Sequence, residues 1–126
     1  MHVLRQIHRA LRVDGWLLDF HPLGSDFAVR AGSRGLGFVD TRRFARVLAA
    51  MNEQVQIVVD EGMYEEVRNL RRHVVERFDS GVEALEEAGS WEHLRLPWLV
   101  RLRLRRHAET PVEFLDTIRY RLFRRC

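Results

Sequence analysis

The chain has 126 residues, an apolar fraction of 46% and a formal net charge of +3 at pH 7, which is typical of one globular domain spanning residues 1–126. It contains no run of about 18 apolar residues, so we expect no membrane-spanning helix. Arg5, Arg9 and Arg12 interrupt the N-terminal segment, which excludes the apolar region of a signal peptide. The single cysteine, Cys126, cannot form an internal disulfide. We therefore expect a cytoplasmic protein.

Arginine supplies all 21 basic residues, and the sequence has no lysine. Frequent arginine, alanine, valine, leucine and glycine are typical of a GC-rich genome, so the positive charge does not by itself indicate a partner. Towards the C-terminus arginines outnumber acidic residues; they are Arg101, Arg103, Arg105, Arg106, Arg119, Arg121, Arg124 and Arg125. We interpret them as a solvated face, with a phosphate-binding surface as the alternative, and we do not expect nucleic acid as a partner.

The first 20 residues have the pattern of a helix, a turn and a strand. Apolar residues recur at helical spacing over residues 2–12, which predicts an amphipathic helix. Asp14–Gly15 is a turn dipeptide. The apolar run Trp16–Phe20 then predicts a strand that is buried on both faces, as in a parallel sheet. His21–Pro22 closes this strand.

This opening carries a resemblance to a known family. Residues 8–19, which read HRALRVDGWLLD, resemble the helix, turn and fifth strand of class I S-adenosylmethionine-dependent methyltransferases. The family typically has L-R-P-G-G before that strand; here Val13 and Asp14 replace the proline and first glycine, and Gly15 is kept. The resemblance implies an α/β fold, with α+β as the alternative. It further implies a partial Rossmann-like sheet with flanking helices and a β-hairpin insertion.

A hairpin and a long helix are predicted next. Two short runs, 27–31 and 36–39, flank the glycine-rich loop 32–35, which predicts two strands joined by a turn. The longest helical pattern covers residues 41–61. It predicts a buried stripe and an exposed opposite side; the stripe is Phe44, Leu48, Met51 and Val55, and the exposed residues are Arg42, Arg46 and Glu53.

The second half of the chain predicts two strands and two helices. Val74, Val75 and Phe78 fit a strand that ends at Asp79. Ser80 and Glu83 form a capping box for a helix over residues 81–88. The remaining segments predict a helix from Pro97 to about 107 and a strand over 113–124, for which a helix over 111–124 is the alternative.

By the resemblance, residues 24–79 correspond to a lid-like insertion region and residues 80–124 to a terminal helix and strand. The family binds its cofactor with a glycine-rich loop after the first strand and an acidic residue that ends the second. Neither is found here, and the glycines of 32–37 lie in a predicted hairpin. The chain thus resembles a C-terminal half, and we expect no cofactor to bind it in isolation; S-adenosylmethionine is implied by the family alone.

Three residues are candidates for a functional site. Asp19 and His21 end the predicted strand, where Asp19 could orient His21 as a general base; a simple polar boundary is the alternative. His21 and Tyr64 are candidates for binding substrate, and for Tyr64 a core or surface aromatic is the alternative. The histidines lack the spacing of metal ligands, so no metal site is predicted.

Three functions follow from these patterns. The first is a methyltransferase-related protein that lacks the cofactor-binding half and is not active alone. The second is a small homodimeric interaction module without enzymatic activity, and the third is an arginine-rich nucleic-acid-binding protein. Without the neighbouring strand of a complete sheet, Trp16–Phe20 would be an apolar edge, so we expect a homodimer that forms through residues 2–20.

Overall fold

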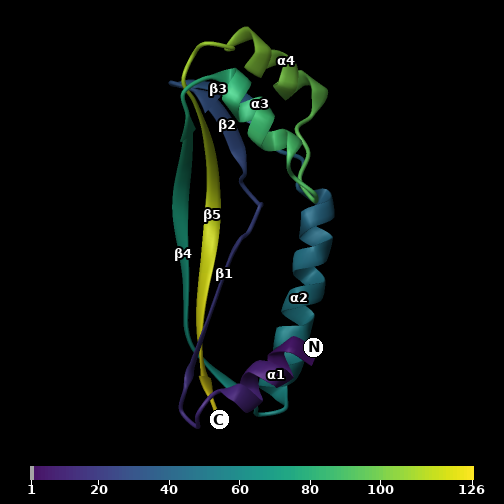
Figure 1. Ribbon diagram of the computed structural model, residues 1–126, viewed down its shortest axis with the longest axis vertical. Helices are drawn as coiled ribbons and strands as arrows, with labels where there is room; N and C mark the ends of the chain where they lie inside the picture. Colours follow the sequence, from purple (N-terminus) through teal and green to yellow (C-terminus); the bar gives the residue numbers. More distant parts are fainter. Residues whose placement is uncertain (1) are drawn as a thin grey trace. The chain divides into compact units, whose positions relative to one another are not determined.

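The computed structural model describes residues 2–126, and these residues form four helices and a five-stranded antiparallel sheet (Figure 1). The predicted mixed α/β composition is confirmed. In chain order the elements are α1 (His2–Ala10), β1 (Trp16–Pro22), β2 (Ala28–Ala31), β3 (Arg34–Phe38), α2 (Arg42–Asp60), β4 (Tyr64–Phe78), α3 (Gly81–Gly89), α4 (Trp98–Arg106) and β5 (Val112–Arg125). No helix of the described residues is long and apolar enough to cross a membrane.

The chain divides into two compact units. Unit 1 contains residues up to Pro22, Arg46–Arg72 and Ile118–Cys126, and unit 2 contains Leu23–Ala45 and His73–Thr117. Both units take part of α2, β4 and β5, because the divisions between the units fall within these elements. Compact units of this kind occur in one domain or in two, so the expected single domain stays a prediction.

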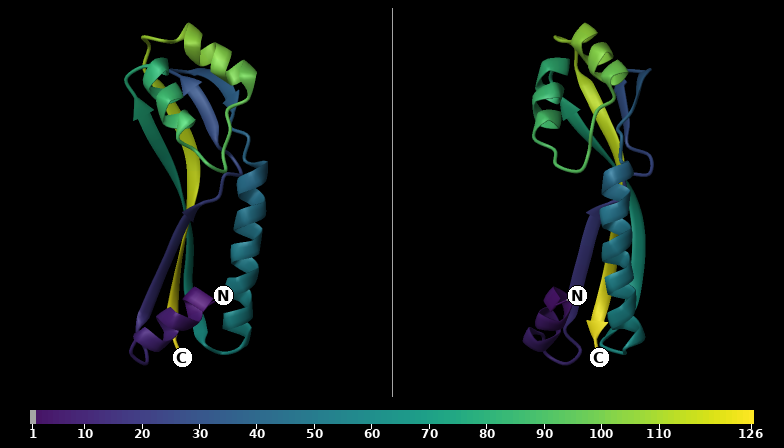
Figure 2. Two further views of the ribbon diagram at one scale, coloured as in Figure 1. Left: turned by 45° about the vertical axis from the view of Figure 1, so that its right-hand side comes forward. Right: turned by 90° about the vertical axis from the view of Figure 1, so that its right-hand side faces the viewer.

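Unit 1 is a three-stranded sheet with helices on one face (Figure 2). β5 lies in the middle, with β4 on one side and β1 on the other, in a register that runs from Trp16 opposite Arg124 to Pro22 opposite Ile118. The predicted turn before β1 is present, with Asp14 at φ 62° and the Gly15 N–H donating to the Arg12 carbonyl. The sheet therefore begins directly after α1.

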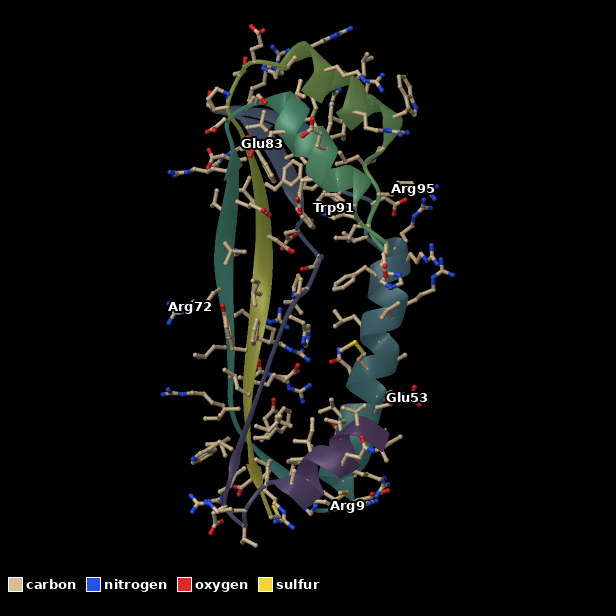
Figure 3. All side chains as sticks on the ribbon, in the orientation of Figure 1. Arg9, Glu53, Arg72, Glu83, Trp91 and Arg95 are labelled. Carbon is tan, nitrogen blue, oxygen red and sulfur yellow. The ribbon has the colours of Figure 1, made fainter. Side chains whose placement is uncertain are left out.

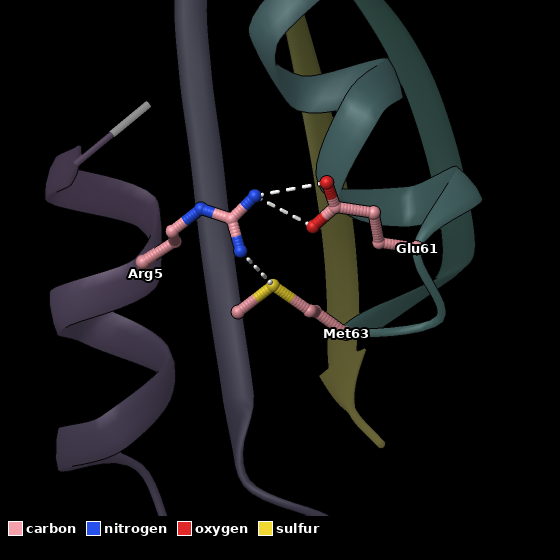
Figure 4. A network of polar contacts seen from close by, with 3 residues as sticks. All are labelled: Arg5, Glu61 and Met63. Atoms are coloured by element: carbon pink, nitrogen blue, oxygen red, sulfur yellow. Dashed lines mark hydrogen bonds and ion pairs between the residues drawn. The ribbon is translucent and has the colours of Figure 1, made fainter.

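The core of unit 1 is small. Its buried residues are Val58 from α2, Tyr64 from β4 and Phe123 from β5, and apolar side chains of α1 pack against them. At the open end of α1, the Arg5 guanidinium donates to both Glu61 oxygens, at 2.9 and 2.7 Å, and contacts the Met63 sulfur (Figure 4). Exposed polar contacts therefore add to the apolar packing that holds α1 in this unit.

Unit 2 is built around the β2–β3 hairpin, which joins the sheet through β2 and β5. The hairpin loop is Gly32–Ser33, two residues shorter than predicted, with Gly32 at φ 59° as a tight hairpin turn requires. α3 and α4 cover this part of the sheet. Trp91, labelled in Figure 3, lies between them and the strands, 5.6 Å from the rings of both Phe27 and Phe114.

Several helix ends lie where the local sequence signals predict them. Ser80 caps α3 by accepting from the Glu83 N–H at 3.2 Å, and the Glu83 carboxylate accepts from the Asp79 N–H. Gly62 follows α2 with φ 76°, as a C-terminal glycine does. Pro97 precedes α4 as its N-cap rather than opening the helix. The last segment is a strand, so the prediction of a strand over 113–124 is confirmed.

The prediction that Trp16–Phe20 is buried on both faces in a parallel sheet is wrong. β1 pairs antiparallel with β5, and its residues alternate between exposed and covered. Trp16, Leu18 and Phe20 are 55%, 56% and 62% exposed, whereas Leu17 packs against the core of unit 1. The run is apolar on both faces, but helices of the described chain cover only one of them.

Two further predictions need correction. In α2, Leu48 is buried and Phe44 and Val55 are partly buried, but Met51 is 47% exposed, so the predicted stripe breaks there. Glu53 points away from α2 into solvent, as expected (Figure 3). The strand expected near Val74–Phe78 begins ten residues earlier, at Tyr64; its middle is exposed and rich in arginine, so it lacks the alternation that marks a strand.

Candidate functional site

A cavity of about 380 Å³ lies inside unit 1, between the sheet and its two helices. All of its lining residues belong to this unit; they are Val3, Leu4, Ile7, Leu17, Leu18, Asp19, His21, Met51, Asn52, Gln54, Val55, Val58, Val59, Tyr64 and Phe123. The lining is apolar apart from a short polar stretch. A cavity of this size and character is typical of a site for a small molecule.

The three candidate residues named from the sequence all line this cavity. Asp19 and His21 lie two apart on β1 and therefore share the face that the helices cover. The His21 Nδ1 atom is 3.4 Å from the Asp19 carboxylate, without the geometry of a hydrogen bond. Their predicted roles in catalysis and binding stay predictions, but their proximity is a property of the fold.

His21 is the unusual residue of this site. It is only 9% exposed, and neither of its ring nitrogens has a hydrogen-bond partner among the described residues. Buried polar atoms nearly always have a partner, because an unsatisfied one costs about 1–3 kcal/mol. A buried imidazole that lines a cavity and makes no hydrogen bond is therefore available to a bound molecule.

Tyr64 lines the same cavity but has a structural role. Its hydroxyl donates to the Leu4 carbonyl at 2.6 Å, which joins β4 to α1, and its ring packs edge-on against His8 and Phe123. Burial raises the pKa of Tyr64, so the hydroxyl keeps its proton at neutral pH. Because the Tyr64 hydroxyl already donates to Leu4, Tyr64 contributes to the cavity mainly as part of its lining.

Sequence reasoning missed the residues of β5 that face Asp19 and His21. In the antiparallel register, Arg121 lies opposite Asp19 and Arg119 lies opposite His21. Arg121 donates to Glu66 at 2.8 Å, and Arg119 donates to the Asn52 side chain at 3.0 Å. The alternation in residues 117–123 shows that these arginines share a face, but the register that places them beside β1 cannot be read from the sequence.

The arginines of β5 also bear on the nucleic-acid alternative. Arg119, Arg121, Arg124 and Arg125 each donate a hydrogen bond within the chain, to Asn52, Glu66, Glu65 and the Leu11 carbonyl respectively. These contacts use part of the donors of each guanidinium, and the nucleic-acid alternative stays a prediction. In unit 2, a separate cavity of about 430 Å³ is lined by Arg34, Arg103, Arg106 and His107.

The chemistry available in the cavity of unit 1 is limited by its residues. The described residues that line it include no serine, cysteine or threonine, so they offer the Asp19–His21 pair no hydroxyl or thiol nucleophile of these types. The described residues contain no group of three or more histidine, cysteine, aspartate and glutamate side chains that could hold a metal ion. The arrangement is thus suited to binding, or to moving a proton on a bound molecule.

The comparisons found no family model, curated protein or solved structure that matches this chain. What the protein does must therefore be inferred from its own residues and geometry.

Proposed function

We propose that this chain is related to the C-terminal half of class I S-adenosylmethionine-dependent methyltransferases, with an incomplete Rossmann-like sheet, and that it does not bind the cofactor by itself. One observation carries the proposal. After the helix, turn and strand that resemble the family come a helix, α2, and two strands, β4 and β5, which pair with each other. The family's fifth strand is likewise followed by a helix and a final pair of strands.

This correspondence differs from the one made on the sequence. The helix after the fifth strand is now α2, and the lid-like insertion that we expected over 24–79 shortens to the segment with the β2–β3 hairpin. α3 and α4 become a second insertion between the two final strands. The antiparallel pairing of the described strands is the feature that departs most from a Rossmann-like sheet, in which neighbouring strands are mainly parallel.

The lack of autonomous cofactor binding follows from the position of the glycines. Gly32, Gly35 and Gly37 lie in the turn and second strand of a hairpin, and the next helix, α2, begins at Arg42, beyond the end of that strand. A phosphate- or nucleotide-binding loop needs a strand before it and a helix N-terminus after it. Among residues 2–126, this glycine cluster therefore provides no such loop.

Calorimetric titration of the chain with S-adenosylmethionine tests the proposal. We expect no saturable heat at micromolar ligand. Saturable binding in that range would contradict the proposal, because it would require a cofactor site within these residues. Circular dichroism of the same sample serves as the control that the chain is folded.

A specific observation favours a second function, that of a homodimeric interaction module. β1 pairs with β5 and with no other strand of the described chain, so its outer edge is unpaired. Trp16, Leu18 and Phe20 are exposed beside this edge, and Leu18 also borders a groove with Leu70, Tyr120 and Leu122. Unpaired edges and exposed apolar patches are both typical of association surfaces.

In this proposal two copies pair edge to edge about a two-fold axis through residues 2–20. Light scattering should give the mass of a dimer at high micromolar concentration. The double substitution Leu18→Lys and Phe20→Lys should give a monomer, because lysine on an edge strand opposes pairing. Val82→Lys is the matched control, since Val82 is similarly exposed on α3. A monomeric parent chain would contradict the proposal.

A further inference from the structure

The cavity of unit 1 has a polar end with unused hydrogen-bond donors. Among the described residues, neither ring nitrogen of His21 has a hydrogen-bond partner, although the Asp19 carboxylate lies 3.4 Å from Nδ1, and the Nε atom of Arg119 is also buried without one. The other end of the Arg119 guanidinium donates to Asn52, which lines the cavity. Arg119 and His21 face each other across β5 and β1. His21 on the cavity lining thus lies opposite Arg119, which reaches the lining through its hydrogen bond to Asn52.

Charges of both signs lie near this end, and the Asp19 carboxylate is 3.4 Å from the Nδ1 atom of His21. Arg121 has Glu66 as its ion-pair partner, but Arg119 makes no ion pair with a carboxylate among the described residues. Burial, together with the neighbouring charges of Arg121 and Arg71, lowers the pKa of Arg119, while Glu66 and Asp19 oppose this effect from a distance. An additional negative group near Arg119 would therefore be stabilised.

The rest of the cavity is apolar. α1 contributes Leu4 and Ile7, and α2 contributes Val55 and Val58. Removing a hydrocarbon chain from water into such a space is favourable by about 0.8 kcal/mol for each methylene group. A ligand that fits both ends must combine an apolar body with one acceptor group that carries negative charge.

We propose that this cavity binds a small amphipathic carboxylate, with its hydrocarbon chain between α1 and α2 and its carboxylate at His21 and Arg119. The buried carboxylate would accept hydrogen bonds from the Arg119 Nε atom and a His21 ring nitrogen, which otherwise make none. Burial of a charge is costly unless it is paired and hydrogen-bonded, and this end of the cavity supplies both kinds of partner. The proposal is independent of any relation to methyltransferases.

Calorimetric titration with decanoate tests the proposal, with decanol as the neutral control of similar length. We expect saturable decanoate binding that is at least about tenfold tighter than decanol binding, which corresponds to about 1.4 kcal/mol. The absence of decanoate binding would overturn the proposal. Equal affinity for the two probes would also overturn it, because the polar end would then not recognise the charge.

Variants locate the binding. Arg119→Gln should weaken decanoate by at least about tenfold and leave decanol unchanged. Arg124→Gln is the matched control on the same strand, because Arg124 pairs with Glu65 and does not line the cavity. Val3→Trp places a large ring at an exposed residue of the lining and should weaken both probes. An effect of Arg124→Gln equal to that of Arg119→Gln would contradict the proposed position of the carboxylate.

A measurement on the unmodified chain covers the case in which Arg119→Gln does not fold. The ring nitrogen resonances of His21 should shift during titration with decanoate, and those of His107, which lines the cavity of unit 2, should not. Saturable binding that leaves the His21 resonances unmoved would overturn the proposal.

Discussion

The two units of this chain fill their interiors differently. Unit 2 buries twelve apolar residues in one cluster, and four aromatic rings, those of Phe27, Phe78, Trp91 and Phe114, contact one another there. Among the described residues the cluster of unit 1 has three buried members, Val58, Tyr64 and Phe123. Unit 2 therefore has a larger close-packed core, whereas the small core of unit 1 lies beside a largely apolar cavity.

This difference indicates that unit 1 carries the candidate functional site. Unit 1 leaves Trp16, Leu18 and Phe20 exposed and His21 buried without a partner. Features of this kind reduce stability, so they are more often found at sites that bind something than in purely structural parts of a fold. The cavity of unit 2, in contrast, is lined mainly by arginine and histidine side chains.

The largest expected effect is on the packed core of unit 2. Phe114 is 1% exposed and its ring lies 5.0 Å from that of Phe78. Phe114→Ala should lower the free energy of unfolding by about 3–5 kcal/mol in urea denaturation. Phe20→Ala in unit 1 is the control, because Phe20 is mostly exposed even though it stacks on Tyr120; it should cost less than about 1 kcal/mol. Similar losses for both variants would remove the distinction between the units.

A second comparison lies within α2. Leu48→Ala should cost about 2–5 kcal/mol, because Leu48 is buried in unit 1. Met51→Ala, one turn further on, should cost less than about 1 kcal/mol, because Met51 is largely exposed and borders the cavity. Thermal unfolding of the two variants side by side measures the difference. A small effect of Leu48→Ala would mean that this helix contributes little to the core of unit 1.

A third, smaller effect concerns how α1 is held in unit 1. Tyr64→Phe removes the buried hydrogen bond to Leu4 and should cost about 1 kcal/mol. Arg5→Gln removes the exposed pair with Glu61, shown in Figure 4, and should cost less than that, since exposed ion pairs contribute about 0–1 kcal/mol. Urea denaturation at low and high salt separates the two, because salt weakens only the Arg5 contact. The reverse order would show that α1 is held by charge.

Much of the secondary structure could be predicted from the sequence because its signals are local. The Ser80–Glu83 capping box, Gly62 and the periodicity of residues 41–61 each depend on neighbours in the chain, and the structure has the corresponding helix ends. β4 was predicted too short because Arg68, Arg71 and Arg72 interrupt its apolar pattern. β4 is held in the sheet by backbone hydrogen bonds to β5, and such pairing does not require a regular pattern of apolar side chains.

The candidate site was predicted only in part, for a related reason. Asp19 and His21 stood out because they end an apolar run, and both line the cavity. Arg119 and Asn52 became visible only in three dimensions, since the first depends on the register of β5 against β1 and the second on the packing of α2. The exposure of Trp16 and Phe20 was missed because apolar residues on both faces of a strand do not show which face is covered.

The smallest expected effects are those of pH on unit 2, where two aspartates respond to acid in opposite ways. Hydrogen bonds from the Arg42 side chain and backbone lower the pKa of Asp40 to about 2. The folded state therefore binds this proton less readily than the unfolded state, and the stabilisation is present above pH 3.8 and lost as the pH falls towards 2. Burial raises the pKa of Asp116, although hydrogen bonds from Thr117 and Gly24 oppose the shift. The folded state therefore binds this proton more readily than the unfolded state, so the contribution of Asp116 to the stability of the fold increases as the pH falls.

Asp40→Asn should therefore flatten the loss of stability between about pH 4 and pH 2, and Asp116→Asn should steepen the loss in acid. The effect at Asp40 should shrink in high salt, because its pair with Arg42 is exposed. Urea denaturation at a series of pH values measures both slopes, and amide resonances assigned to each unit show where the change occurs. If the amides of unit 1 follow the Asp40→Asn change as closely as those of unit 2, the two units unfold together, and their different packing does not give them separate stabilities.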